Sequence, residues 1–377
     1  MPAASILIKP ASSNCNIDCS YCFYKKLCRT RESYSLGRMS TETLTALIKN
    51  AFSYAQGLVS FAFQGGEPML AGLDFFKTAV SLEKKYAPKG LIVENTIQTN
   101  GVLLDEEWAR FFAQEDFLVG VSLDGPKKIH DAYRKGANGT GTFVRVMDSL
   151  SLLSRFKVRF NIAAVITQET SKKASYLYKF WKRNNFQYVQ VIPCMGNTWA
   201  AGGDMRLAES EYSVRPDAWG RFLSELFDLW YADFTRGDDM EIRTFSNYAQ
   251  LAAGFAAEEC GMNGHCTCYF VSEANGSVYP CDFYCTDEYC LGNVNEPFGN
   301  MAASRCAVKF VEESALINEK CRRCEFFGLC KGGCRHWRVK EDNLNYLCEG
   351  YKIFFEHCAV RLENLGKMVL ANIRSGY

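Results

Sequence analysis

Three cysteines within eight residues constrain this chain more than any other feature of its sequence. The segment Cys15-Asn-Ile-Asp-Cys19-Ser-Tyr-Cys22 follows a short apolar run, Ile6 to Ile8, that predicts a β-strand. Cysteine thiolates are the usual ligands of iron–sulfur clusters, and a [4Fe–4S] cluster normally takes four of them. Three closely spaced thiols therefore indicate a cluster with one iron left open to bind another group.

Other interpretations of this loop are weaker. A structural zinc site prefers four tetrahedral ligands, usually as two C-x2-C pairs, whereas this loop supplies three thiols on one spacing. Cys28 is a candidate fourth ligand, but it follows a basic segment that we expect to be flexible, and it lies outside the compact loop. A disulfide within the loop would need an oxidising compartment.

The overall cysteine content points to metal chemistry as well. The 377 residues include eighteen cysteines and only four histidines. The N-terminus lacks the basic start and long apolar region of a signal peptide, so we expect a cytoplasmic protein. In a reducing cytosol such cysteines bind metals or act in catalysis more often than they form disulfides. Sites rich in thiolate and poor in histidine favour iron–sulfur clusters or zinc.

Charge and hydropathy exclude several classes of partner. The formal net charge is +1, which gives no reason to expect nucleic acid or an anionic membrane as partner. No segment approaches the roughly 20 unbroken apolar residues of a membrane span. The length allows one large domain and a smaller one. We expect a monomer with neither a nucleic-acid nor a membrane partner.

Up to about residue 235, apolar runs of strand length alternate with amphipathic helical stretches, which predicts an α/β fold with a parallel sheet. The predicted strands are 5–9, 59–64, 92–99, 118–123, 158–166 and 188–192. The predicted helices are 41–56 with Ser40 as N-cap, 75–86, 105–114, 143–155, 171–184 and 215–234. Six such units are too few for a closed eight-fold barrel.

Polar and glycine-rich segments follow the predicted strands. They are Gln64-Gly-Gly-Glu67-Pro68, then Gln98-Thr-Asn-Gly101, then Ser122-Leu-Asp124-Gly125. In barrels built of parallel strands the active groups lie at the carboxyl ends of the strands. Glycines let the backbone approach a ligand closely, and the carboxylate of Glu67 can accept a hydrogen bond from an ammonium group. The cysteine loop and these segments therefore predict one ligand site.

The C-x3-C-x2-C spacing, followed after the next strand by Gly65-Gly66-Glu67, resembles the radical S-adenosylmethionine enzymes. The resemblance implies a partial, open (β/α)6 barrel whose [4Fe–4S] cluster binds the amino and carboxylate groups of S-adenosylmethionine. In addition to Gly66 and Glu67 near the methionine amino group, it assigns cofactor contacts to Tyr21, Ser122, Asp124, Arg134 and Met195. Without the resemblance, Arg134 beside Lys135 would be interpreted as a solvated loop charge.

Eight of the thirteen cysteines in the last third of the chain form a second group of candidate ligands. They are Cys260, Cys266, Cys281, Cys321, Cys324, Cys330, Cys334 and Cys348. Eight thiols suit two four-iron clusters or a binuclear zinc module, and cysteine spacing alone leaves both open. Gly276-Ser-Val-Tyr-Pro-Cys281 and the Cys-x2-Cys-x5-Cys-x3-Cys run resemble the SPASM extension of radical enzymes. That resemblance implies two auxiliary [4Fe–4S] clusters, one on Cys260, Cys266, Cys281 and Cys334, the other on Cys321, Cys324, Cys330 and Cys348.

Longer segments resemble the anaerobic sulfatase-maturating enzymes. They are Leu7-Ile-Lys-Pro-Ala-Ser-Ser, Phe61-Ala-Phe-Gln-Gly-Gly-Glu-Pro, Leu118-Val-Gly-Val-Ser-Leu-Asp-Gly-Pro and Ser277-Val-Tyr-Pro-Cys-Asp-Phe-Tyr284. The resemblance implies radical oxidation of a sulfatase cysteine or serine to Cα-formylglycine. It assigns proton acceptance to Asp282 and substrate contacts to Tyr24 and Gln64. On the sequence alone, Asp282 would be interpreted as a local backbone cap in a turn.

The same resemblance implies the partners: an unfolded or nascent sulfatase polypeptide and a low-potential electron donor such as flavodoxin or ferredoxin. The predicted domains are a radical barrel over 1–240, a SPASM domain over 241–350 and a C-terminal helix over 351–377 that packs on the core. We interpret 195–216 as an insertion or lid. The alternatives are a radical maturase of ribosomal peptides and a non-catalytic zinc or iron–sulfur scaffold protein.

Overall fold

The computed structural model describes residues 3–195 and 211–374, and contacts divide the chain into two units. The first unit comprises Met1–Leu123, Lys127–Asn161 and Thr267–Phe310, and the second comprises Asp124–Pro126, Ile162–Cys266 and Val311–Tyr377. The predicted insertion over 195–216 lies largely outside the described residues. The predicted domain limits at 240 and 350 were drawn from motifs and stay a prediction.

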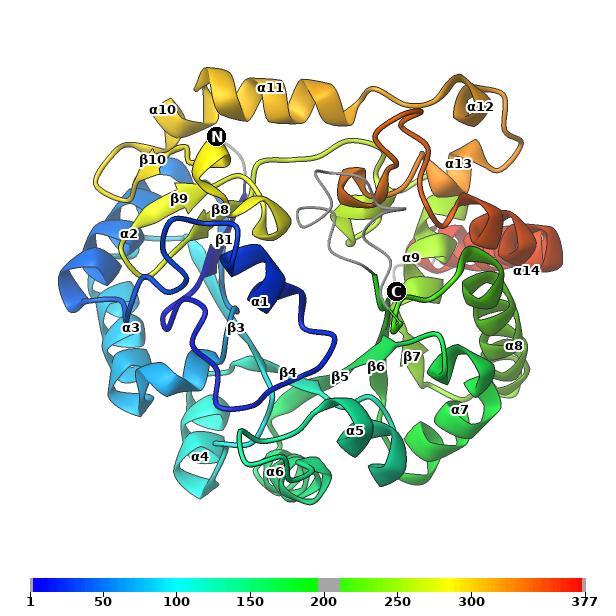
Figure 1. Ribbon diagram of the computed structural model, residues 1–377, viewed down its shortest axis with the longest axis horizontal. Coiled ribbons are helices and arrows are strands. Elements are labelled where there is room, and N and C mark those ends of the chain that lie inside the picture. The colour runs from blue at the N-terminus through cyan, green and yellow to red at the C-terminus, as the bar shows by residue number, and fades with distance from the viewer. Residues whose placement is uncertain (1–2, 196–210, 375–377) are drawn as a thin grey trace. The chain divides into compact units, whose positions relative to one another are not determined.

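The first unit is built on strands in the order β10-β9-β8-β1-β2-β3-β4 (Figure 1). They are β1 (Ala4–Ile8), β2 (Leu58–Phe63), β3 (Ile92–Thr99), β4 (Leu118–Ser122), β8 (Phe270–Ser272), β9 (Ser277–Tyr279) and β10 (Gly292–Asn293). The strands from β8 through β4 are parallel, whereas β9 and β10 run antiparallel to their neighbours. The hairpin that carries Cys281 thus extends the same sheet beyond β1.

Helices cover the strands of this unit. They are α1 (Phe23–Cys28), α2 (Thr41–Tyr54), α3 (Leu73–Tyr86), α4 (Glu106–Gln114), α5 (Lys127–Tyr133), α6 (Phe143–Arg155) and α10 (Phe298–Ala302). The predicted cap of α2 is confirmed, because the Thr43 amide donates to the Ser40 hydroxyl at 3.1 Å. Phe63, Phe76 and Phe117 are buried together beneath α3, and each contributes roughly 1.5–3 kcal/mol by burial.

The second unit contains three parallel strands and the helices around them. The strands are β5 (Arg159–Ile166), most of which belongs here, β6 (Tyr188–Pro193) and β7 (Glu241–Ile242). The helices are α7 (Ala174–Arg183), α8 (Pro216–Phe234), α9 (Arg243–Ala252), α12 (Glu319–Arg322), α13 (Phe327–Cys330) and α14 (Cys348–Arg374), while α11 (Arg305–Ser314) joins the two units. Four aromatic residues of α8 are buried in the core of this unit: Trp219, Phe222, Phe227 and Trp230.

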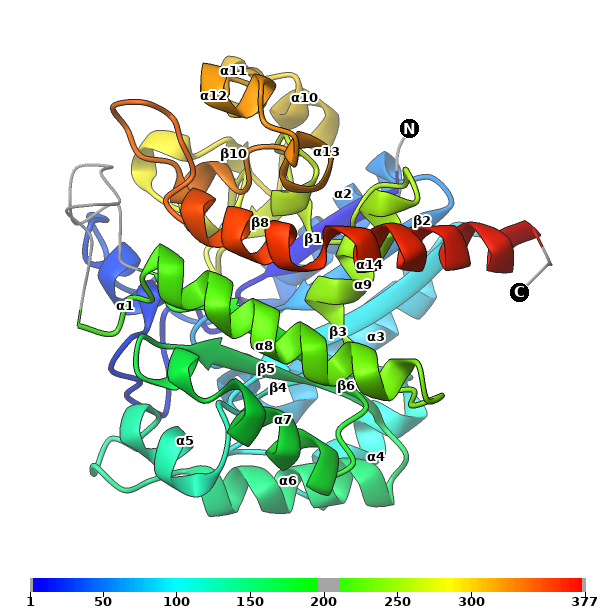
Figure 2. The same cartoon turned by 90° about the vertical axis from the view of Figure 1, so that its right-hand side faces the viewer.

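Helix α14 lies alongside α8 and α9, as Figure 2 shows. Glycines allow the close approach. A Cβ on Gly220 of α8 would lie 2.4 Å from the Gly350 carbonyl oxygen, and a Cβ on Gly350 would lie 2.1 Å from the Pro216 carbonyl oxygen. Backbone therefore packs on backbone, and neither glycine tolerates a side chain without movement of a helix.

Most predicted elements are found within a few residues of their expected limits, but two expectations were wrong. The basic segment before Cys28 is the helix α1, because Leu27 and Cys28 are buried and anchor it. The βα alternation also continues past residue 240, through β7 and α9. A two-residue strand is too short to show periodicity in the sequence. Among the described residues, no helix is long and apolar enough to span a bilayer.

We predict that Gly220→Ala and Gly350→Ala each lower the free energy of unfolding by about 1–3 kcal/mol, because the added methyl group overpacks the α8–α14 contact. Urea unfolding followed by circular dichroism measures the change. The matched control is Gly299→Ala in α10, where a Cβ meets nothing within 4 Å. Equal stability of the Gly220 and control variants would contradict the close-packing interpretation.

Candidate active site

The register of three parallel strands creates the site. Strands β1, β2 and β8 end level with one another, so the next residue of each, Lys9, Gln64 and Glu273, lies at the same edge of the sheet. The Gln64 amide donates to the Ile8 carbonyl at 3.0 Å, and the Lys9 amide donates to the Ser272 carbonyl at 2.8 Å. The polar side chains are therefore fixed to the sheet by their own backbone.

Asp282 lies among side chains from this edge. It begins the short 3-10 turn η5 (Asp282–Tyr284) after β9. Its Oδ2 accepts a hydrogen bond from the Tyr24 hydroxyl and one from Gln64 Nε2 at 3.4 Å, while its Oδ1 lies 2.8 Å from Lys9 Nζ. Gln64 Nε2 also donates to the Tyr24 hydroxyl oxygen at 3.1 Å. The structure thus brings together the predicted proton acceptor and both predicted substrate residues.

Three charged residues around Asp282 were not predicted from the sequence. The Lys9 side chain is 2% exposed, its Nζ is 3.7 Å from Glu273 Oε1, and it lies 4.7 Å from the Tyr24 ring centroid. Burial alone would lower the pKa of Lys9, but Asp282, Glu273 and other neighbours raise it well above its usual value. Arg31 Nη1 lies 2.7 Å from Glu273 Oε1. The sequence offered one sign of this cluster, because Lys9 is a charged residue at the end of the apolar strand β1.

The cysteine loop lies between polar donors of the first unit. The Cys22 amide donates to the Cys19 carbonyl at 3.3 Å, which closes the turn between them. Asn100 Nδ2 is 3.7 Å from Cys15 Sγ, and Arg134 Nη1 is 3.9 Å from Cys19 Sγ. Hydrogen bonds to ligand sulfurs tune the potential of an iron–sulfur cluster. Asn100 is a further residue to which the sequence analysis assigned no role.

Arg134 and Tyr21, which are both predicted cofactor contacts, lie at the cysteine loop. Arg134 is buried and its guanidinium lies 5.5 Å from the Tyr21 ring centroid. The alternative interpretation of Arg134 as a solvated charge is therefore wrong. A guanidinium can stack on an aromatic ring and still donate two parallel hydrogen bonds to a carboxylate, so Arg134 suits a carboxylate partner.

The carboxylate of Glu67 is buried and accepts hydrogen bonds from its own turn and from the end of β3. It accepts from the amides of Met69 at 3.0 Å and Asn100 at 2.8 Å, and from the Thr99 hydroxyl at 2.8 Å. Burial raises the pKa of Glu67 to about 7, although these three hydrogen bonds act in the opposite direction. A ligand ammonium would supply the countercharge that favours the carboxylate, which fits the methionine amino group of the predicted cofactor.

The backbone packing at residue 66 requires a glycine, whether or not a cofactor is bound. The φ of Gly66 is +54°, and a Cβ there would lie 2.2 Å from the Asn14 carbonyl oxygen. The Glu67 amide donates to that same carbonyl at 2.8 Å. The glycine therefore lets the second strand's end pack on the cysteine loop, and its direct contact with a cofactor stays a prediction.

The remaining predicted contacts have partners within the protein. Ser122 Oγ accepts from Gln98 Nε2 at 3.1 Å in the first unit. Asp124, in the second unit, is fully buried, and its Oδ1 accepts from the Val165 amide at 3.1 Å. This bond holds the Asp124 turn to β5. The assigned ribose contacts of Ser122 and Asp124 stay predictions.

Met195 is the last described residue before the undescribed segment. It packs against the buried Val339 together with Trp337 and Tyr346 in the second unit. These neighbours belong to the segment that carries the auxiliary cysteines. Its assigned contact with the cofactor stays a prediction.

The second predicted auxiliary set surrounds one cavity. Cys321, Cys324, Cys330 and Cys348 all line a space of about 440 Å³ in the second unit. Burial raises the pKa of Cys330 to about 12 and that of Cys348 to about 11. A bound cation must offset this cost for thiolates to form. No three metal-ligating side chains of the described residues converge tightly enough for a single ion, whereas the cavity has room for a larger group.

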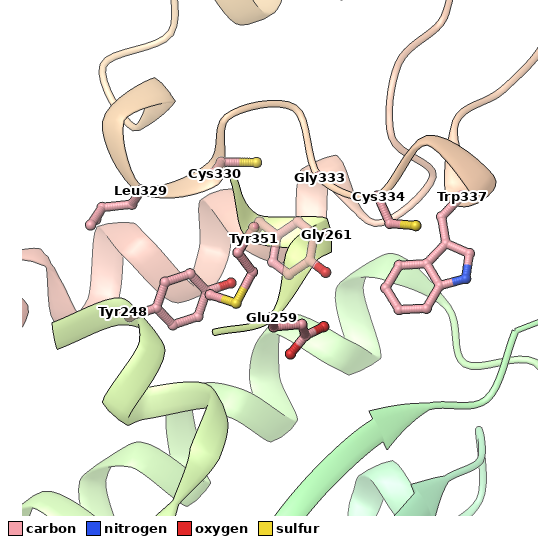
Figure 3. A pocket seen from close by; sticks show the side chains of 10 residues that line it. Tyr248, Glu259, Gly261, Leu329, Cys330, Gly333, Cys334, Trp337 and Tyr351 are labelled. Carbon is pink, nitrogen blue, oxygen red and sulfur yellow. The ribbon is translucent and has the colours of Figure 1, made fainter. Parts of the chain in front are cut away.

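The first predicted auxiliary set is divided between the units. Cys260, Cys266 and Cys334 belong to the second unit, where burial and then the nearby Cys260 and Cys266 thiols raise the pKa of Cys334, and Cys281 belongs to the first. A Cβ on Gly261 would lie 3.1 Å from Cys334 Cβ, so the glycine lets these segments meet. Figure 3 shows Cys334 beside Trp337, with Glu259 and Tyr351 below the segment that carries Cys330.

Comparison with known proteins decides the family. A model of the radical SAM superfamily matches residues 10–180, and one of the iron–sulfur cluster-binding SPASM domain matches residues 262–325. A cysteine-type anaerobic sulfatase-maturating enzyme of Clostridium perfringens is 43% identical over 374 residues, covering 98% of this chain and all of the relative. This chain belongs to the anaerobic sulfatase-maturating enzymes. The predicted fold class, a partial (β/α)6 radical SAM barrel with a SPASM domain, is confirmed.

A serine-type relative and a solved structure support the assignment. A serine-type anaerobic sulfatase-maturating enzyme of Bacteroides thetaiotaomicron is 33% identical, with 97% of this chain and 92% of the relative covered. The solved structure of native anSMEcpe with bound AdoMet and a Cp18Cys peptide matches with a TM-score of 0.90 and 41% identity, covering 98% of this chain and all of that one. The predicted S-adenosylmethionine agrees with the AdoMet bound in that structure, and the predicted iron–sulfur clusters agree with the two matched domain models.

We predict that Cys348→Ser lowers the iron content of the reconstituted maturating enzyme by about one third, from about 12 to about 8 atoms per chain, because one of three four-iron clusters loses a ligand. Iron and zinc are measured by atomic spectroscopy. Cys290→Ser is the control, since Cys290 is exposed and outside all three ligand sets. Unchanged iron in the Cys348 variant, or zinc in place of iron in the parent protein, would contradict the assignment.

Proposed function

We propose that this chain oxidises an active-site cysteine of a sulfatase polypeptide to Cα-formylglycine. The observation that carries the proposal is the placement of Asp282 between Tyr24, Gln64 and Lys9, in the same unit as the cysteine loop. Cysteine is the proposed target because the cysteine-type relative is 43% identical and the serine-type relative 33%. A serine target would give the aldehyde directly.

The reaction removes two hydrogens from the target side chain. Converting –CH₂–SH to –CH=S takes one hydrogen atom from Cβ, one proton from sulfur and one electron, and water then replaces sulfur to leave the aldehyde and hydrogen sulfide. When bound, the S-adenosylmethionine and the clusters supply the acceptors for the hydrogen atom and the electron. The chain must provide the acceptor for the proton.

Asp282 is the proposed proton acceptor. Its Oδ2 is the oxygen that meets hydroxyl and amide donors, so it is the position where a thiol proton would be received. A general base must lie within hydrogen-bond reach of the proton it takes. Tyr24 and Gln64 hold Oδ2 in the free chain, and they are the proposed contacts of the target side chain.

The proposed partners follow from this chemistry. The clusters need a low-potential electron donor such as flavodoxin or ferredoxin, and the substrate is an unfolded or nascent sulfatase. None of the eighteen cysteines, all of which lie in the described residues, forms a disulfide, which supports a reducing compartment, the cytoplasm. We propose that the chain acts as a monomer.

We predict that Asp282→Asn leaves cluster content and S-adenosylmethionine cleavage near wild type but lowers formylglycine formation by at least about 10²-fold, in the range of lost general-base catalysis. The measurement is anaerobic incubation with matched Cys- and Ser-containing sulfatase peptides, followed by mass spectrometry for the aldehyde. Wild-type yield from the variant would exclude Asp282 as the base. A different modification by the parent protein would exclude the proposed reaction.

A further inference from the structure

Four buried or half-buried side chains of alternating charge form a continuous row in the first unit. Arg31 Nη1 lies 2.7 Å from Glu273 Oε1, the same oxygen lies 3.7 Å from Lys9 Nζ, and Lys9 Nζ lies 2.8 Å from Asp282 Oδ1. The side chains of Lys9, Arg31 and Glu273 are at most 2% exposed, and that of Asp282 is 14% exposed. The row ends at the proposed proton acceptor.

The row holds the turn that carries Asp282 at both ends. Lys9 reaches Asp282 at the start of η5, while Arg31 Nε donates to the Cys285 carbonyl at 2.5 Å just after that turn ends. Lys9 and Glu273 themselves extend from the level ends of β1 and β8. The turn is thus fixed to the sheet through side chains.

The Lys9 stem has little freedom to move. A Cβ on Gly65 would lie 2.8 Å from Lys9 Cγ, so the stem runs directly beneath the glycine turn after β2. Its ammonium also faces the Tyr24 ring at 4.7 Å. The ammonium forms ion pairs with the carboxylates of both Asp282 and Glu273.

Stability alone does not explain such a row. Burying charges costs several kcal/mol per ion, and an apolar replacement of a buried ion pair is often neutral or stabilising. In this arrangement the two oxygens of the Asp282 carboxylate have different partners. Lys9 occupies Oδ1, and Tyr24 and Gln64 face Oδ2.

We propose that Lys9 is a positioning residue for the oxidation: held by Glu273 and Arg31, its ammonium fixes Oδ1 of Asp282 so that Oδ2 is the oxygen presented to the target side chain. This inference rests on the proposed function of Asp282. It predicts that loss of Lys9 separates radical generation from product formation, because the hydrogen atom is still removed while the proton acceptor is misaligned.

The test is Lys9→Met, assayed anaerobically for 5′-deoxyadenosine and formylglycine in the same reaction. We expect formylglycine formed per deoxyadenosine to fall at least about tenfold, with kcat reduced and the peptide KM within about twofold of wild type, since a small misplacement of a catalytic group has effects of this size. Lys77→Met is the matched control, because Lys77 pairs with Glu107 at 3.0 Å on the surface of the same unit. A wild-type ratio in Lys9→Met would overturn the proposal.

A second variant separates positioning from charge balance and guards against misfolding. Lys9→Met leaves Glu273 with one cation and Asp282 with none, whereas Lys9→Met/Glu273→Gln restores neutrality without restoring the ammonium. We expect the double variant to keep the low ratio of formylglycine to deoxyadenosine. Recovery of the wild-type ratio would show that Lys9 only balances charge, and would overturn the proposal.

A structural readout keeps this inference apart from the proposed function. We expect a crystal structure of Lys9→Met to show the Asp282 carboxylate rotated from the position that meets Tyr24 and Gln64. An unmoved carboxylate would overturn the positioning role whatever the substrate is. Absence of formylglycine from the wild-type reaction would instead overturn the proposed function.

Discussion

The level ends of three parallel strands are the constraint on which the site depends. Because β1, β2 and β8 stop at one edge, the residues that follow them meet although they lie far apart in the chain. Lys9 precedes the cysteine loop, Gln64 precedes Gly66 and Glu67, and Glu273 precedes the hairpin to Cys281 and Asp282. A single register therefore places the cysteine loop, the proposed substrate residues and the proposed proton acceptor in one unit.

The buried charges and thiols share a physical requirement. Glu67, Cys330 and Cys348 all have pKa values raised by burial, so a bound cation would favour their charged forms. The ammonium group of a ligand would supply this cation for the Glu67 carboxylate, and cluster iron would supply it for the two thiols. Asp282 differs from these groups because the protein supplies its cation, Lys9, and this difference distinguishes the proposed proton acceptor from the proposed cofactor contacts.

Sequence spacing was sufficient where ligands are close in the chain. Cys15, Cys19 and Cys22 share one loop, and a periodic helix such as α8 shows its buried face directly. Sequence spacing was insufficient where the function of a residue depends on partners far away in the chain. Asp282 was identified as the base only by family resemblance, and its contacts with Tyr24 and Gln64 required the fold. Glu273 and Arg31 carried no local pattern at all.

By itself the sequence determined the chemistry that this protein can hold: thiol ligands at cluster spacing, glycine turns after strands, and six strand–helix units that place such turns at one edge. Only the tertiary structure decided how the charges pair. Ion pairs such as Lys9 with Asp282 join residues separated by most of the chain, and their energy depends on distance and burial, which no spacing in the sequence encodes. The proposed proton acceptor, Asp282, is present in the sequence, but the orientation of its carboxylate comes from the fold.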